Sequence, residues 1–171
     1  MQDTITQILK AVPSETERYA LVRLLGYLGD RLSSQTLTSA GLRIKGGSAS
    51  AIVQAHTVVY ATAKGVLVTK AVDTDMAALS GTVTNAKFNV FCHFIDSAGN
   101  LTTVMGIEGS TLAAVTFPPI PQQKAMIGFT IINPTGTGNF VGGTTQLDDG
   151  TVTPNAVFVN VLGAFDPSIQ L

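Results

Sequence analysis

Residues 87–105 have the sequence KFNVFCHFIDSAGNLTTVM, which contains two apolar runs separated by a short polar segment. The runs Lys87–Asp96 and Leu101–Met105 are rich in β-branched and aromatic residues, as strands are. The segment between them is Asp96-Ser97-Ala98-Gly99-Asn100, in which Gly99 and Asn100 tolerate a positive φ. This stretch predicts two antiparallel strands joined by a tight turn.

Similar short runs, separated by Gly, Pro, Asn and Asp, occur throughout the second part of the chain. The further predicted strands are Leu42–Lys45, Thr57–Ala61, Val66–Thr69, Met76–Val83, Leu112–Phe117, Ala125–Ile132 and Ala156–Leu162. No helical period separates them, which disfavours a parallel βαβ topology. We therefore predict a mainly β protein, an antiparallel β-sandwich with a jelly-roll-like arrangement, preceded by an N-terminal helical segment.

The N-terminal part has the periodicity of helices. Ile5, Ile8 and Leu9 begin an apolar stripe, which Pro13 ends because the residue before a proline avoids the helical region. Ser14 and Glu17 then form a capping-box pattern that predicts the start of a second helix, over residues 15–33. We call the apolar side of this second helix the leucine face; it consists of Leu21, Leu24, Leu25, Leu28 and Leu32.

Two uses of the leucine face remain open from the sequence. It can pack on the β part of its own chain, or it can contact another chain. The spacing of Leu21, Leu25, Leu28 and Leu32 also suits a short coiled-coil seam. We expect Ile5, Ile8, Leu9, Leu21, Leu25 and Leu28 to take part in docking or self-association.

Charged residues are unevenly distributed. They make up 12% of the 171 residues, against about 25% in typical domains. Residues 1–45 hold ten of them, and 14 of the 17 glycines lie from Gly46 onward. This shift predicts a helical arm or anchor over 1–45 and a β-sandwich domain over 46–171. The low charge of the β part suggests that some of its surface is covered in an assembly.

A long glycine-rich loop follows the run Ala125–Ile132. It extends over residues 133–145 and reads NPTGTGNFVGGTT, without the Gly-Lys-Ser/Thr that a phosphate-binding loop requires. Its glycines favour a close-packed loop instead. We expect it to form a second contact surface, with Thr135, Thr137, Asn139 and Phe140 as the contact residues.

The pattern of reactive residues does not predict an enzyme. Cys92 and His93 are neighbours on one predicted strand, so their side chains point to opposite faces. Asp148-Asp149-Gly150 has the composition of a turn in which Asp bonds its own backbone, and Asp73 and Asp75 form the other carboxylate pair. The spacing fits neither an EF-hand nor a zinc site. We predict no catalytic residues, no metal and no cofactor.

Charge and hydropathy also restrict the partners and the location. The formal net charge of −1 disfavours binding to nucleic acid through its phosphates. No apolar run approaches the ~20 residues of a membrane helix, and Met1-Gln2-Asp3-Thr4 does not begin a secretory signal. A single cysteine cannot form an internal disulfide. We expect a protein made in a cytoplasm, which stays there or joins a particle released by lysis.

Several phrases between residues 87 and 161 resemble structural proteins of tailed-bacteriophage virions. They are KFNVF (87–91), DSAGNLT (96–102), LAAVTFP (112–118), IGF (127–129), IINPTGTGNFVGGTT (131–145), LDD (147–149) and PNAV (154–157). The resemblance implies a virion component, first a capsid decoration (cement) protein that binds the major capsid protein or other virion proteins, often as a trimer. A head or tail fibre module that binds a receptor is the alternative.

Two further interpretations compete with a virion role. One is a small enzyme such as a glycan hydrolase, which would need two carboxylates facing each other across a cleft. The other is a small β domain with no link to a virus. In the virion interpretation, closed cyclic self-association would hide sheet edges that otherwise invite uncontrolled pairing.

Overall fold

The computed structural model describes residues 14–46, 51–153 and 156–165. Within these ranges the protein is mainly β, with several antiparallel sheets and one helix near the N-terminus, which confirms the predicted fold class at this level. The predicted residues Ile5, Ile8 and Leu9 lie outside the described ranges. No helix in the described part combines the length and apolarity needed to span a membrane.

The helix α2 (Glu15–Ser33) occupies the range expected from the sequence. Ser14 caps it, since the Ser14 hydroxyl accepts a hydrogen bond from the Glu17 backbone N–H at 3.4 Å. Glu15 and Glu17 lie in the first turn and Arg31 in the last, where each charge complements the helix dipole. The capping and charge pattern explains why the helix begins and ends where the sequence predicts.

The described residues of the β part form four sheets. The largest has the strand order β12-β10-β8-β9; the others have the orders β1-β4-β5, β2-β3-β6 and β11-β7, and all their strand pairs are antiparallel. The strands are β1 (Gln35–Thr36), β2 (Leu42–Ile44), β3 (Val53–Ala55), β4 (Val59–Ala63), β5 (Val66–Lys70), β6 (Thr74–Asp75), β7 (Thr82–Val83), β8 (Asn89–Ile95), β9 (Leu101–Met105), β10 (Ala125–Ile132), β11 (Phe140–Val141) and β12 (Val157–Asn160).

The hairpin predicted from residues 87–105 forms as β8 and β9. Ile95 pairs with Leu101, and the Asp96 carboxylate accepts the backbone N–H groups of Ala98 and Asn100, both at 2.9 Å. Gly99 adopts a φ of 82°. These bonds lower the pKa of the Asp96 carboxyl, chiefly through the contacts with Asn100. The turn residues therefore act as the sequence suggests.

Both faces of the β12-β10-β8-β9 sheet are covered by apolar side chains. On one face, Phe91, Ile95 and Ile127 pack with residues of the smaller sheets, among them Leu42, Val59 and Val68. On the other, Val90, Cys92 and Phe94 pack under the connection between β9 and β10, where Phe117 meets the ring of Phe129 edge-on at 5.0 Å. Successive side chains of β8 thus alternate between two separate apolar clusters.

Three sequence predictions differ from the structure. The run Met76–Val83 was expected to form one strand, but only Thr82–Val83 is a strand, β7, and residues 76–81 lie outside any strand. Residues 112–117 were expected to form a strand, but Leu112–Ala114 form a short 3₁₀ helix, η1, with exposed side chains. Pro118 and Pro119 follow directly and cannot donate to a ladder. The division at residue 45 also differs, since β1 and β2 pair with strands of the β part. The helical segment therefore ends near residue 34.

Candidate functional site

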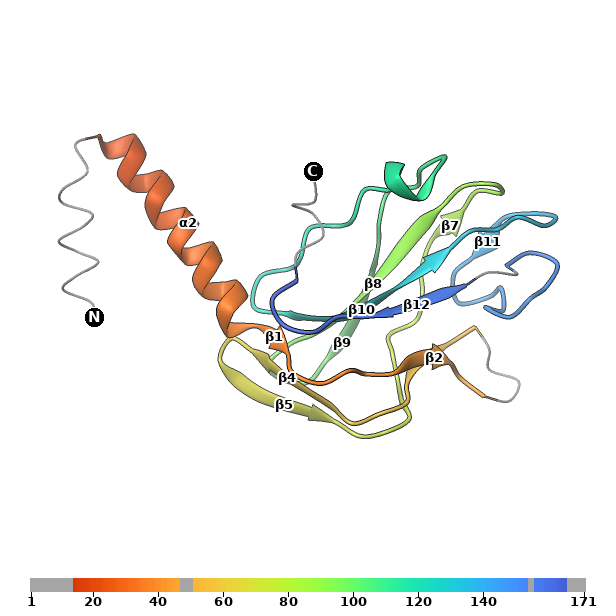
Figure 1. The fold of residues 1–171 in the computed structure, drawn as a ribbon, viewed down its shortest axis with the longest axis horizontal. Coiled ribbons are helices and arrows are strands. Elements are labelled where there is room, and N and C mark those ends of the chain that lie inside the picture. The colour runs from red at the N-terminus through yellow and green to blue at the C-terminus, as the bar shows by residue number, and fades with distance from the viewer. Residues whose placement is uncertain (1–13, 47–50, 154–155, 166–171) are drawn as a thin grey trace.

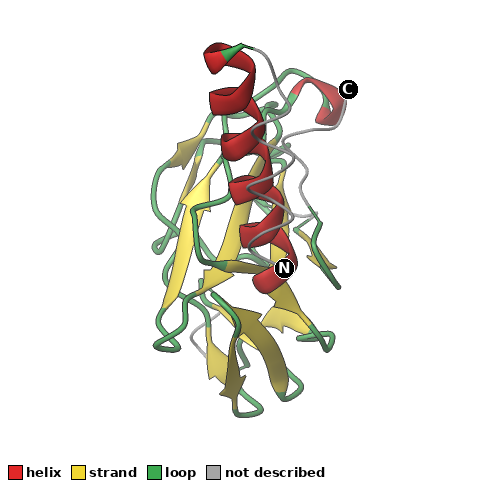
Figure 2. Cartoon of the chain, turned by 90° about the vertical axis from the view of Figure 1, so that its left-hand side faces the viewer, coloured by secondary structure: helices red, strands yellow, loops and turns green. Residues whose placement is uncertain are grey.

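The most distinctive surface of the molecule is α2, which projects from one end of the β part (Figure 1). Figure 2 shows the molecule from the side of α2, which is the long helix of the described residues; the rest of the view is mostly strands and loops. Its attachment to the β part determines which of its sides remains uncovered.

The last turns of α2 are fixed to the connection between η1 and β10. The backbone N–H of Gln123 donates to both carboxylate oxygens of Asp30, at 2.9 and 3.1 Å. Arg31 donates from Nη2 to the Pro121 carbonyl at 3.2 Å and pairs with Asp30 at 2.7 Å. Arg31 is only 7% exposed, so this is a largely buried ionic anchor.

The start of β1 continues this attachment. The Ser34 hydroxyl accepts the backbone N–H of Lys64 at 3.0 Å, and the Ser33 carbonyl accepts that of Gly65 at 2.8 Å. Lys64 and Gly65 form the tight turn between β4 and β5, with φ values of 54° and 75°. The C-terminal end of α2 is thus bonded to two separate segments of the β part.

The leucine face points away from these anchors. At 100° per residue, Leu21 lies about 180° around the helix axis from Asp30. Leu24, Leu25, Leu28 and Leu32 are 41–70% exposed, and Leu21 is half-buried. The only buried residue of α2 is Arg31. Among the described residues, the leucine face therefore does not serve as packing for the β part.

The glycine-rich loop divides into surface and core residues. Thr135, Thr137 and Asn139 are exposed, and Asn139 accepts the backbone N–H of Asn85 at 2.9 Å. Phe140, also predicted as a contact residue, is fully buried in β11 and meets the ring of Phe91 edge-on at 5.9 Å. Phe140 is therefore a core residue. Burying its aromatic side chain in the apolar cluster stabilises the fold more than exposing it to a partner would.

Gly136 occupies a position in this loop that has no room for a side chain. A Cβ at this position would lie 1.4 Å from the Thr151 carbonyl oxygen, and the same oxygen accepts the Thr137 backbone N–H at 3.0 Å. The loop thus lies directly on residues 149–153, whose turn is organised by Asp149. As the sequence predicts, the Asp149 carboxylate accepts the backbone N–H of Thr151, at 2.8 Å.

The residues with reactive side chains are held in structural contacts. Cys92 is buried, and burial raises the pKa of its thiol to about 12. His93 contacts the hydroxyls of Thr103 and Thr130, each at 3.0 Å. The Thr103 hydroxyl donates to the Ala77 carbonyl at 2.8 Å, so it accepts from His93 Nδ1. Burial lowers the pKa of His93 to about 3, which keeps the ring neutral.

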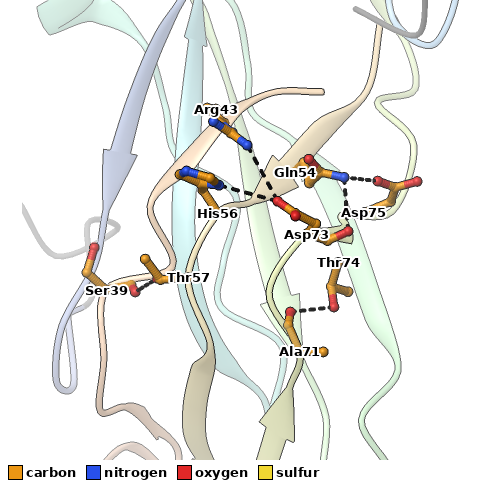
Figure 3. Close-up of polar contacts among 9 residues, drawn as sticks. All are labelled: Ser39, Arg43, Gln54, His56, Thr57, Ala71, Asp73, Thr74 and Asp75. Atoms are coloured by element: carbon orange, nitrogen blue, oxygen red, sulfur yellow. Dashed lines mark hydrogen bonds and ion pairs between the residues drawn. The ribbon is translucent and has the colours of Figure 1, made fainter. Parts of the chain in front are cut away.

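A polar cluster lies on the exposed side of the β2-β3-β6 sheet (Figure 3). Asp73 contacts His56 Nδ1 at 3.3 Å and Arg43 at 3.5 Å. The adjacent Asp75 contacts Lys45 at 2.5 Å and Gln54 at 2.9 Å. The bond with Lys45 is the main reason why the pKa of Asp75 is lowered. The carboxylates are thus engaged by cations of their own chain, on a surface where such pairs stabilise little.

Sequence reasoning missed the anchoring residues Asp30, Arg31 and Gln123. Asp30 and Arg31 had been assigned to the polar side of the helix, but nothing in their spacing reveals a partner about 90 residues away.

Comparison of the chain with protein-family models, curated protein sequences and solved structures found no match.

Proposed function

We propose that the protein is a non-enzymatic structural component of a virion, specifically a capsid decoration (cement) protein that binds and reinforces the major capsid lattice. One observation carries the assembly role: α2 docks through Asp30 and Arg31 and leaves the leucine face uncovered by the described β part. A protein that acts by contact requires such a surface. The resemblance of residues 87–161 to tailed-phage virion proteins supports the location on a capsid.

The β part would be the unit displayed on the capsid. We propose a jelly-roll-like β-sandwich for it, because the β12-β10-β8-β9 sheet packs one face against β2, β3, β4 and β5 through a continuous apolar cluster. Thr135, Thr137 and Asn139 offer hydrogen-bonding side chains on an exposed loop. We assign this loop to the contact with the major capsid protein, and α2 to contacts that bring copies together as a homotrimer.

A head or tail fibre module that binds a receptor is the second candidate. It is favoured by the position of α2, which leaves the β part at one end and extends away from it as a stalk would (Figure 1). In that case the loops at the far end of the β part would bind the receptor. Both candidates share assembly in the host cytoplasm and a final place on the particle.

The experiment that tests the proposal uses capsids of the encoding phage prepared without this protein. Purified protein is added, unbound protein is removed, and the particles are imaged at subnanometre resolution. We expect saturable density at repeated positions on the outer capsid surface. A triple variant, Thr135→Ala, Thr137→Ala and Asn139→Ala, should bind more weakly, whereas Thr69→Ala on the exposed side of β5 should not. Absence of density on capsids would overturn the decoration role, and labelling confined to the tail tip would favour the fibre module.

A further inference from the structure

We propose that the leucine face of α2 binds the leucine faces of two further copies of the chain, in a parallel three-helix bundle that gathers three β parts at one end. This inference rests on the proposed assembly role and names the partner of α2. The size of the apolar surface, the spacing of its leucines and the attachment of the helix support it.

The size of the exposed surface matches an interface between proteins. A standard interface buries about 800 Å² on each partner, of which about 60% is apolar. The leucine face together with Val22 exposes on the order of 500 Å² of apolar surface, which is the apolar share of such an interface. Leu32 is 70% exposed although it is next to the β part. An apolar surface of this size on a lone helix is costly in water.

The spacing indicates that the occupant is another helix of the same type. Leu21, Leu25, Leu28 and Leu32 follow intervals of four, three and four residues, which is the a/d pattern of a coiled-coil seam. Identical helices in parallel register place each leucine against its own counterpart. A second copy therefore supplies the complementary surface without any other partner.

The flanks of the seam favour three copies over two. Val22 and Leu24 lie on opposite sides of the seam and are 49% and 53% exposed. In a pair of helices each helix faces one neighbour, and Val22 and Leu24 would remain exposed to solvent. In a three-helix bundle each helix faces two neighbours, so both flanks are covered. The side that bears Arg23 and Asp30 remains outside the bundle, free to keep the anchor to Gln123.

The attachment favours a parallel bundle. The C-terminal turn of α2 is bonded to Gln123, Pro121 and Lys64, so the β part cannot swing away from that end. An antiparallel pairing that matches Leu21 with Leu32 would run the first turns of each helix alongside the β part of the other copy. In the parallel bundle, the first turns of the three helices instead lie together at the end away from the anchors.

Sedimentation velocity of the full chain over a range of concentrations tests the inference. We expect a species of three chains for the wild type, and an at least ~100-fold higher assembly midpoint for Leu28→Glu, because a charge would enter the seam. Leu67→Glu is the matched control, since Leu67 is 61% exposed on β5, outside α2. A wild type that remains monomeric, or a trimer that Leu28→Glu leaves intact, would overturn the inference.

Cysteine cross-linking tests the parallel register. Cys92 is buried, so any disulfide between copies should form through the introduced cysteine. Oxidised Leu28→Cys protein should form covalent dimers within the trimer, whereas Arg23→Cys, on the outer side of α2, should not. Efficient cross-linking between Leu21→Cys and Leu32→Cys copies would contradict the parallel arrangement.

The inference and the proposed function fail separately. A monomeric protein that still decorates capsids would overturn the three-helix bundle alone. A trimer that ignores capsids would overturn the decoration role alone.

Discussion

The backbone N–H of Gln123 donates to both carboxylate oxygens of Asp30, and this contact joins α2 to the β part across 93 residues of sequence. Because Asp30 lies opposite Leu21 on the helix, the same contact turns the leucine face outward. The orientation of the candidate assembly surface therefore depends on a polar anchor on the other side of the helix.

Replacing Asp30 with Ala should loosen α2 without unfolding the β strands. The Gln123 N–H loses its acceptor and Arg31 loses its ion-pair partner, at a cost of about 1–3 kcal/mol in the free energy of unfolding. Hydrogen exchange should rise at Gln123 and in the last turn of α2, and stay unchanged in β8 and β10. Glu15→Ala, at the exposed start of α2, is the control. Equal exchange in both variants would show that Asp30 does not anchor the helix.

Phe140→Ala should destabilise the protein by about 3–5 kcal/mol, because it empties a fully buried position beside Phe91. Thr137→Ala, three residues earlier and exposed, should change the free energy of unfolding by less than about 0.5 kcal/mol. Urea denaturation measures both values. Similar losses in the two variants would contradict the division of this loop into surface and core residues.

Gly136→Ala should disturb the contact between the glycine-rich loop and residues 149–153. The added Cβ would meet the Thr151 carbonyl, so one of the two segments has to move, at about 1–3 kcal/mol. Gly150→Ala, whose Cβ would meet nothing within 4 Å, is the matched control. Chemical shifts of the Thr137 and Thr151 amides should change in the first variant. Unchanged shifts there would indicate that the loop is not packed as described.

Neutral, buried His93 should make the protein less stable as the pH falls. Its pKa is lowered from 6.5 to about 3 in the folded state, so the unfolded state binds more protons between these values. Stability is therefore present above pH 6.5 and declines below it, by at most about 1.4 kcal/mol per pH unit. This slope should be absent in His93→Gln and retained in His56→Gln, whose ring is exposed. A wild-type slope in His93→Gln would refute the assignment.

Local signals in the sequence predict much of this fold. Ser14, Glu17 and the leucine periodicity define α2, while the turn residues Asp96–Asn100 define the β8–β9 hairpin. The alternation in β12 also holds, with Val159 in one apolar cluster and Phe158 against the other. Each of these signals acts within a few residues of the chain, which is why one sequence suffices to detect them.

Other features depend on contacts that local signals do not contain. The strands β1, β6, β7 and β11 have two residues each, too few to show alternation. The run 112–117 has the composition of a strand, but the prolines that follow it carry the chain across the sheet. The leucine face of α2 was recognised as apolar, yet its outward orientation follows from Asp30 and Gln123, which are distant in sequence.

The most direct test of the central claim is hydrogen exchange in α2 as a function of protein concentration. An isolated helix of this length, with two glycines, is marginally stable in water, so contact between copies should protect it. We expect amides of residues 18–30 to exchange slowly at high concentration and quickly after dilution, while β8 and β10 stay protected at both. Exchange in α2 that does not depend on concentration would contradict the claim that its leucine face joins copies of the chain.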